Sequence, residues 1–86
     1  MLTKRDLKKL QKIEPSDLKV GDIIAIELQV DDRTEYAIYR ICQEKDKYCI
    51  LSSQGEVLVK YNSIQELSEI MIALFSNVHF YSSKGY

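Results

Sequence analysis

Residues 63–75 of the chain read SIQELSEIMIALF, and this stretch is the strongest local signal for the fold. Ser63 is followed three residues later by Glu66, which is the capping-box pattern that begins many helices. The apolar residues that follow recur at helical spacing, so the segment predicts a helix with one face turned towards a core. The predicted core-facing residues are Ile64, Leu67, Ile70, Met71, Leu74 and Phe75.

Four segments with strand character precede this helix, and short polar turns separate them. In the clearest one, 23–30, the even positions are apolar and the odd positions end in Glu27 and Gln29, as is typical of a half-buried strand. Connections this short favour hairpins, so we expect a curved antiparallel meander, close to a half-barrel, with the helix on its open side. The predicted strands are 23–30, 35–42, 47–53 and 56–61, with a short final strand, 78–81, after the helix.

A short basic helix is predicted within residues 1–14. Thr3 and Asp6 have the spacing of a capping pair, and the helix runs to about Lys12 before Pro15, which cannot continue it. Its apolar stripe is thin and its remaining surface is basic. We therefore expect this helix to be loosely attached to the rest of the domain.

The length and composition indicate a single α+β domain that spans residues 1–86. Of the 86 residues, 45% are hydrophobic and 29% are charged, which is an ordinary globular mixture. The formal charge is 12 − 13 = −1, so the whole molecule has no general attraction to nucleic acid or anionic lipid. Residues 1–20 sum to 6 − 3 = +3 and residues 21–86 to 6 − 10 = −4, which makes the basic end a candidate contact face. Residues 82–86 are expected to be a flexible tail.

The two cysteines, Cys42 and Cys49, lie in strand-like runs with apolar neighbours and without a CxxC pair. We interpret them as two buried free thiols. They can still face each other across a hairpin, but a disulfide needs an oxidising compartment. No apolar run approaches the roughly 20 residues of a membrane span, and the first residues lack the apolar centre of a signal peptide. We therefore expect a cytoplasmic protein that does not enter a membrane.

The sequence contains no catalytic or metal-binding constellation that we can identify. His79 is the only histidine and lies in the predicted final strand, the acidic pairs lie in predicted turns, and the three glycines are isolated. A cation site would need several more converging oxygens. We therefore predict that the protein is not an enzyme and uses no metal or cofactor.

Tyrosine is the over-represented residue type, with six copies against no tryptophan. Tyrosines that align on neighbouring strands, beside an arginine and a lysine, would form a platform for stacking or protein contact. The alternative is that several of them pack the sheet with their hydroxyls at its rim. The candidate binding residues are Tyr36, Tyr39, Arg40, Tyr48, Lys60 and Tyr61.

A rigid sheet that presents tyrosines and arginines matches the usual chemistry of protein contacts. We therefore expect a non-enzymatic binding protein whose partner is a protein. In size, near-neutral charge and lack of catalytic residues the chain resembles the small proteins of bacteriophages and mobile elements, which often inhibit host or defence complexes. Two alternatives stay open. One is a homo-oligomer that sequesters a nucleotide-like ligand, with Arg33, Arg40 or Lys60 on its phosphate. The other is a half-barrel for single-stranded nucleic acid, which the acidic body disfavours.

Overall fold

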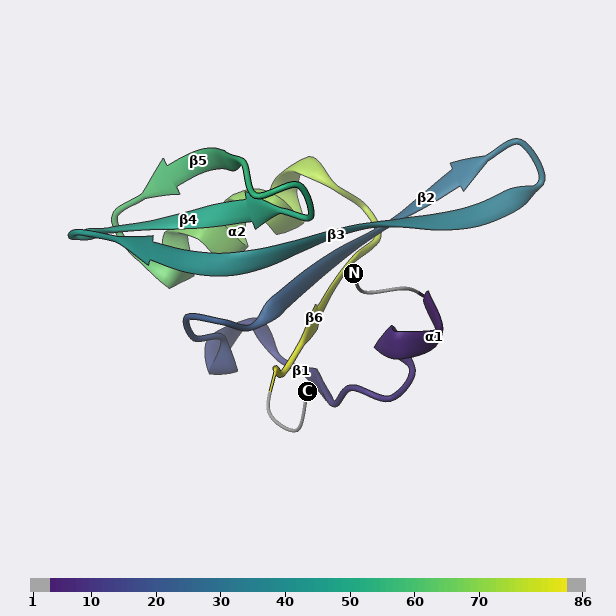
Figure 1. The fold of residues 1–86 in the computed structure, drawn as a ribbon, viewed down its shortest axis with the longest axis horizontal. Helices are drawn as coiled ribbons and strands as arrows, with labels where there is room; N and C mark the ends of the chain where they lie inside the picture. The colour runs from purple at the N-terminus through teal and green to yellow at the C-terminus, as the bar shows by residue number, and fades with distance from the viewer. Residues whose placement is uncertain (1–3, 84–86) are drawn as a thin grey trace.

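The computed structural model describes residues 4–83, which form a six-stranded antiparallel sheet with one main helix (Figure 1). The α+β class predicted from the sequence is confirmed. In chain order the elements are α1 (Lys4–Leu7), β1 (Lys12–Ile13), the 3-10 helix η1 (Pro15–Asp17), β2 (Ile23–Val30), β3 (Arg33–Glu44), β4 (Lys47–Ser52), β5 (Val57–Tyr61), α2 (Ile64–Leu74) and β6 (Val78–Tyr81).

The sheet has the strand order β1-β6-β2-β3-β4-β5, so the predicted meander forms its β2–β5 half. The sequence predicts four strands before the helix and one after it, and this total is wrong because the sheet has six strands. The strand that was not predicted is β1. The final strand lies beside β2, where Phe80 faces Ile24, since α2 carries the chain across the sheet to the other side of β2. The turn between β2 and β3 is also tighter than predicted, because Asp31 adopts a positive φ of 56° and allows a two-residue connection.

The first helix is much shorter than the sequence predicts. It ends at Leu7, and two four-residue turns follow, closed by bonds from Lys9 N to Asp6 O and from Leu10 N to Leu7 O. The predicted helix end at Lys12 is instead part of β1, whose Ile13 pairs with Phe80 at the free edge of β6. The capping role predicted for Thr3 lies outside the described residues.

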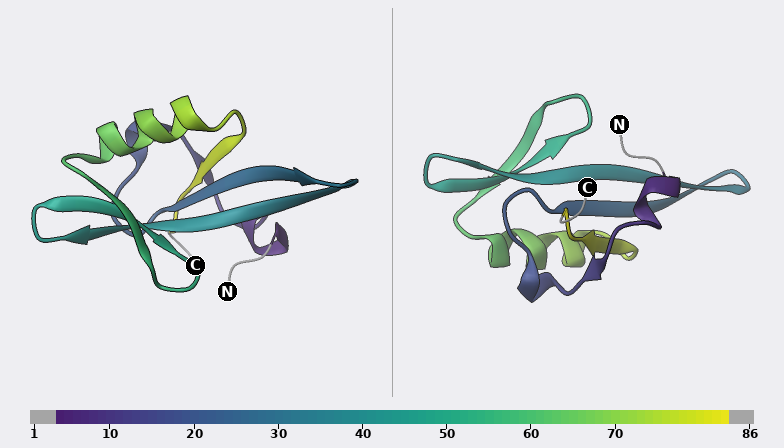
Figure 2. Two further views of the ribbon diagram at one scale, coloured as in Figure 1. Left: turned by 90° about the horizontal axis from the view of Figure 1, so that it is seen from above. Right: turned by 60° about the horizontal axis from the view of Figure 1, so that its bottom comes forward.

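The main core lies between α2 and one face of the sheet (Figure 2, left). Ser63 caps the helix as predicted, with Glu66 N donating to Ser63 Oγ at 3.0 Å. The predicted place of Leu74 in the core is wrong, because its side chain is 68% exposed in the last turn, beyond the buried cluster. The buried residues of this cluster are Leu18, Ile24, Ile26, Ile41, Ile50, Leu67, Met71 and Phe80.

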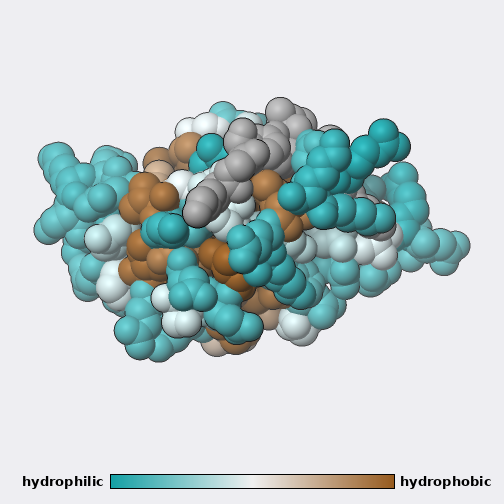
Figure 3. Space-filling model, turned by 90° about the horizontal axis from the view of Figure 1, so that it is seen from below, coloured by the Kyte–Doolittle hydropathy of each residue, from teal (hydrophilic) through white to brown (hydrophobic). Residues whose placement is uncertain are grey.

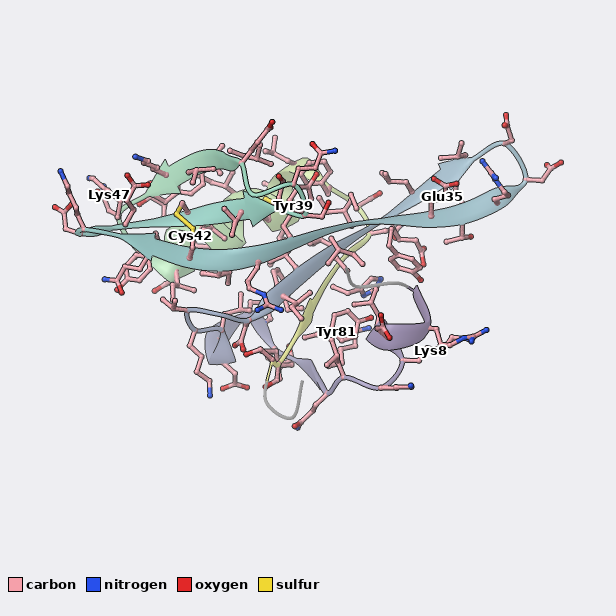
Figure 4. All side chains as sticks on the ribbon, in the orientation of Figure 1. Lys8, Glu35, Tyr39, Cys42, Lys47 and Tyr81 are labelled. Atoms are coloured by element: carbon pink, nitrogen blue, oxygen red, sulfur yellow. A yellow bond between two sulfur atoms is a disulfide. The ribbon has the colours of Figure 1, made fainter. Side chains whose placement is uncertain are left out.

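A second, smaller cluster lies on the opposite face of the sheet, below α1. Leu7 is buried there against Ile23 and Ala25, and Tyr81 packs beside them (Figure 4). Figure 2 shows α1 and α2 on opposite sides of the β2–β3 hairpin, which continues past the rest of the sheet as a two-stranded arm. Leu7 is thus the contact that attaches α1, and the loose attachment of this segment stays a prediction.

The end of the described chain is bonded to the start of β2. Ser82 N donates to Gln11 O, and Ser83 donates from both its amide and its hydroxyl to Asp22 Oδ1. Residues 82 and 83, predicted as part of a flexible tail, are therefore held in place. The rest of that predicted tail lies outside the described residues.

Cys42 and Cys49 form a disulfide, so the interpretation of two free thiols is wrong (Figure 4). The two residues face each other directly in the β3–β4 register, with Cα atoms 5.2 Å apart, a distance that suits a disulfide. The sequence pattern did place both residues in strands. The hairpin register then brings the two side chains together on the sheet face opposite α2.

Candidate binding groove

An open groove of about 510 Å³ runs between η1 and α2. Figure 2 (right) shows these two elements side by side at the lower edge of the molecule. The groove has an apolar surface with a polar rim, as binding sites usually do. Its lining residues are Pro15, Ser16, Leu18, Ile64, Gln65, Ser68, Glu69 and Ile72.

The η1 wall is fixed by a short local sequence. Glu14 is extended, and Pro15 begins the 3-10 turn with the φ angle that its ring imposes. Leu18, directly after the turn, is buried in the main core. The turn is therefore held against α2 through its last apolar residue, while Ser16 and Asp17 remain exposed.

The α2 wall consists of Ile64, Ser68 and Ile72, which lie on one side of the helix because they are four residues apart. Ser68 is buried, and its hydroxyl donates to Gln65 O at 2.9 Å, so its polar atom is satisfied within the helix. Ile72 is 48% exposed at the outer end of the wall. The wall thus offers apolar contact area without a competing buried donor.

One acidic side chain lines this groove, and two more are exposed in segment 12–19, which also carries the exposed Lys12 and Lys19. Glu69 lines the groove, and Glu14 and Asp17 are exposed on the η1 side. Among residues 4–83, none that lines the groove is basic. Glu69 Oε1 accepts one hydrogen bond, from Gln65 Nε2 at 3.1 Å, which leaves most of the carboxylate's acceptor sites available. The electrostatics of the groove therefore favour a cationic ligand over an anionic one.

The predicted tyrosine platform does not form around its two cations. Strand residues alternate between faces, so neighbours such as Tyr39 and Arg40 point to opposite sides of the sheet. The registers place three tyrosines on the α2 face, where they are half-buried against the main core, and both cations on the other face. The α2-face residues are Tyr39, Tyr48 and Tyr61, the exposed cations are Arg40 and Lys60, and Tyr36 lies in the smaller cluster.

Arg40 and Lys60 share a sheet face but are not neighbours. Arg40 lies opposite Leu51, whereas Lys60 lies opposite Cys49 and pairs with Glu44 at 3.3 Å between Nζ and Oε1. Both members of this ion pair are about half exposed, so the pair contributes little to stability. The two cations therefore offer an exposed charged surface rather than a phosphate pocket.

Tyr36 has a structural role beside Glu27. Its hydroxyl donates to Glu27 Oε1 at 3.0 Å, and this bond raises the pKa of Tyr36, with burial as the second cause. Burial, followed by the charge of Glu27, also raises the pKa of Tyr81. Both phenols belong to the contacts of the smaller cluster, below α1.

We expect the protein to lose stability in alkali through these two tyrosines. Both tyrosines have a raised pKa in the folded state. Their contribution to the free energy of unfolding is therefore fully present below about pH 10, the ordinary pKa of tyrosine, and is lost as the pH rises through the raised pKa values. Urea unfolding at a series of pH values on both sides of this point measures the decline. The decline should be smaller in Tyr36→Phe. An identical decline in this variant and the wild type would contradict the assignment.

Exposed apolar side chains also lie on β5, at one edge of the sheet. Val57, Leu58 and Val59 are all exposed, and Leu58 matches Ile72 at 48%. Edge strands of this kind can pair with other chains. However, the β4–β5 register shifts between Cys49 and Leu51, and such an irregularity disrupts the regular ladder that a pairing strand needs.

The surface seen from below has brown hydrophobic patches among teal hydrophilic side chains, and these patches do not merge into one large area (Figure 3). Among residues 4–83, no cluster of three or more His, Cys, Asp or Glu side chains has the arrangement of a metal site. In the same part of the chain, no helix combines the length and hydrophobicity needed to cross a membrane.

Sequence reasoning missed the groove because its walls come from two distant segments, 15–18 and 64–72. A signal was nevertheless present in α2. Ile72 is apolar but is not among the predicted core-facing residues of α2. It lies on the same side of the helix as Ser68, four residues earlier. An apolar residue beyond the core-facing stripe indicates a second surface that the helix can present.

Comparison with known proteins returns no matching family model, no similar curated protein and no similar solved structure.

Proposed function

We propose that this is a non-enzymatic binding protein that acts through protein–protein contact, with the groove between η1 and α2 as its contact site. The observation that supports this most directly is the half-exposed Ile72 at the rim of an apolar groove. Apolar anchors that fill such grooves supply much of the energy in protein interfaces. An inhibitory role against a host or defence complex stays a prediction, which rests on the size, the near-neutral charge and the lack of catalytic residues in the sequence.

The charges around the groove favour a protein partner over a nucleotide-like ligand. A phosphate needs cationic or amide donors, whereas the described lining of the groove contains Glu69 and no basic side chain. Of the three cations predicted for phosphate binding, Arg40 and Lys60 lie on the sheet face opposite α2, and Arg33 pairs with Glu35 at the start of β3. The nucleotide and nucleic-acid alternatives stay predictions that no arrangement in the described residues favours.

We expect Ile72→Glu to remove partner capture. A carboxylate at this position would face an apolar groove and add to the acidic rim, so the affinity should fall at least about tenfold, equivalent to roughly 1.4 kcal/mol. The measurement is affinity capture from host lysate with the tagged protein, followed by titration of the captured partner. Leu58→Glu is the matched control, because this leucine is equally exposed but lies on β5.

The two variants separate the groove from the sheet edge. Support for the proposal requires that a stoichiometric partner bind the wild type and Leu58→Glu but not Ile72→Glu, while circular dichroism shows all three folded. The opposite pattern, with capture lost only in Leu58→Glu, would move the contact site to β5. Equal capture of the partner by all three proteins would contradict the proposal.

A further inference from the structure

We infer that the groove accepts a short basic amphipathic segment of the partner, which places apolar side chains between η1 and α2 and pairs a lysine or arginine with Glu69. This inference rests on the proposed protein-binding function and adds the chemistry of the partner. It follows from the dimensions of the groove, its charges and the state of the chain's own basic segment.

The dimensions favour a short linear segment. The α2 wall runs from Ile64 to Ile72, which are eight residues apart and therefore about 12 Å apart along the helix axis. An extended chain covers this distance with about four residues, and a helix with about eight. The volume of about 510 Å³ suits a few side chains rather than a whole protein surface. The partner should therefore insert one turn or one extended stretch.

The charges select a basic segment. Glu69 lies within the groove, and Glu14 and Asp17 are exposed on the η1 side. Hydrogen bonds between a guanidinium or ammonium group and a carboxylate are stronger than neutral ones, and apolar walls around them reduce the competition from water. An acidic segment of equal hydrophobicity would instead meet the Glu69 carboxylate, whereas the exposed Lys12 and Lys19 offset the carboxylates on the η1 side. The rim thus supplies specificity, while the apolar lining supplies contact area.

The basic segment is expected to come from a different protein rather than from a second copy of this chain. The chain has its own basic apolar stretch near α1, but Leu7 of that stretch is buried against Ile23 and Ala25. A second copy would have to expose these residues before its leucine could enter the groove. A second copy can therefore present this stretch only after it gives up the contact of Leu7.

The test uses two synthetic eight-residue peptides with leucines at the same positions. One carries lysine at the remaining positions and the other carries glutamate. Each is titrated into the folded, ¹⁵N-labelled protein. We expect the lysine peptide to bind at least about tenfold more tightly than the glutamate peptide. The lysine attracts Glu69 and the glutamate repels it, and this difference changes affinity by about that factor. The shifted amides should include Ser68, Glu69 and Ile72, and added salt should reduce the preference.

A charge reversal in the protein makes the test specific. Glu69→Lys should reverse the preference between the two peptides, whereas Glu56→Lys, an exposed reversal beside β5, should leave it unchanged. Equal binding of the two peptides, binding of neither, or shifts confined to another surface would overturn the inference. Any of these outcomes would contradict the inference about the partner's charge. The proposed function would still be supported if Ile72→Glu abolishes partner capture. Light scattering that shows a dimer disrupted by Glu69→Lys would also overturn the inference, in favour of a second copy.

Discussion

Replacement of Asp22 by alanine should lower the free energy of unfolding by about 3 kcal/mol, a large effect for one polar side chain. Asp22 is only 1% exposed. Its Oδ2 accepts from Lys19 N at 3.0 Å, and its Oδ1 accepts from the amide and the hydroxyl of Ser83 at 3.1 and 3.3 Å. Alanine would leave these donors without their partner in a partly buried position. Urea unfolding followed by circular dichroism measures the loss.

Two further variants show whether the hydrogen bonds are the cause. Ser83→Ala removes only the longest of the three bonds and should cost about 0.5–1 kcal/mol. Asp22→Asn keeps the shape and one acceptor oxygen, so its cost should fall between those of the other two variants. A loss below about 1 kcal/mol in Asp22→Ala would contradict the role assigned to this carboxylate, since that is the value of one ordinary bond.

Asp22 also connects the fold to the groove. It closes the turn that begins at Lys19, directly after Leu18, the residue that holds η1 against the core. It binds Ser83 as well, across a sequence separation of 61, and so fixes the segment after β6 beside the start of β2. Loss of this side chain should therefore loosen the η1 wall, and partner capture should weaken together with stability.

The parts of the fold that the sequence predicts are those with local causes. The Ser63 cap and the apolar period of α2 depend on residues within a few positions of each other, and the alternation in 23–30 defines β2. The position of β6 beside β2 and the pairing of β1 with β6 depend on which free edge a strand meets after the chain has crossed the sheet. Such long-range pairing leaves no mark in a single sequence.

The candidate site was less predictable for a related reason. The groove brings Pro15 and Ile72 together from segments more than fifty residues apart, which no spacing rule indicates. The predicted platform does not assemble because strand alternation places Tyr39 and Arg40 on opposite faces, and Lys60 and Tyr61 likewise. The tyrosines within residues 4–83 all pack against one of the two apolar clusters.

The disulfide between Cys42 and Cys49 joins the two strands of the β3–β4 hairpin. These strands carry Ile41 and Ile50 into the main core, each directly beside a cysteine. The bridge thus crosslinks two strands whose ladder register buries both isoleucines. The bridge therefore crosslinks the part of the sheet, around β3 and β4, that lies beside the start of α2.

Removal of this bridge should lower the free energy of unfolding by about 2.5 kcal/mol, the chain-entropy value for a loop of this size. The bond joins residues with a sequence separation of 7, so it restricts the unfolded hairpin while the folded register is kept by the strand ladder. Guanidinium unfolding with and without a reductant measures the difference. The double variant Cys42→Ser, Cys49→Ser should unfold like the reduced protein and should not respond to reductant.

The same pair of cysteines tests the predicted cytoplasmic location. Disulfides persist in oxidising compartments and are reduced in most cytosols. Cys49 is fully buried, so alkylation must follow rapid acid denaturation of whole cells, which preserves the thiol state. Two alkylated cysteines would mean that the protein works without its bridge and is less stable in the cell by the amount predicted above. Cysteines that resist alkylation until they are reduced would place the protein in an oxidising compartment, and the cytoplasmic prediction would then be wrong.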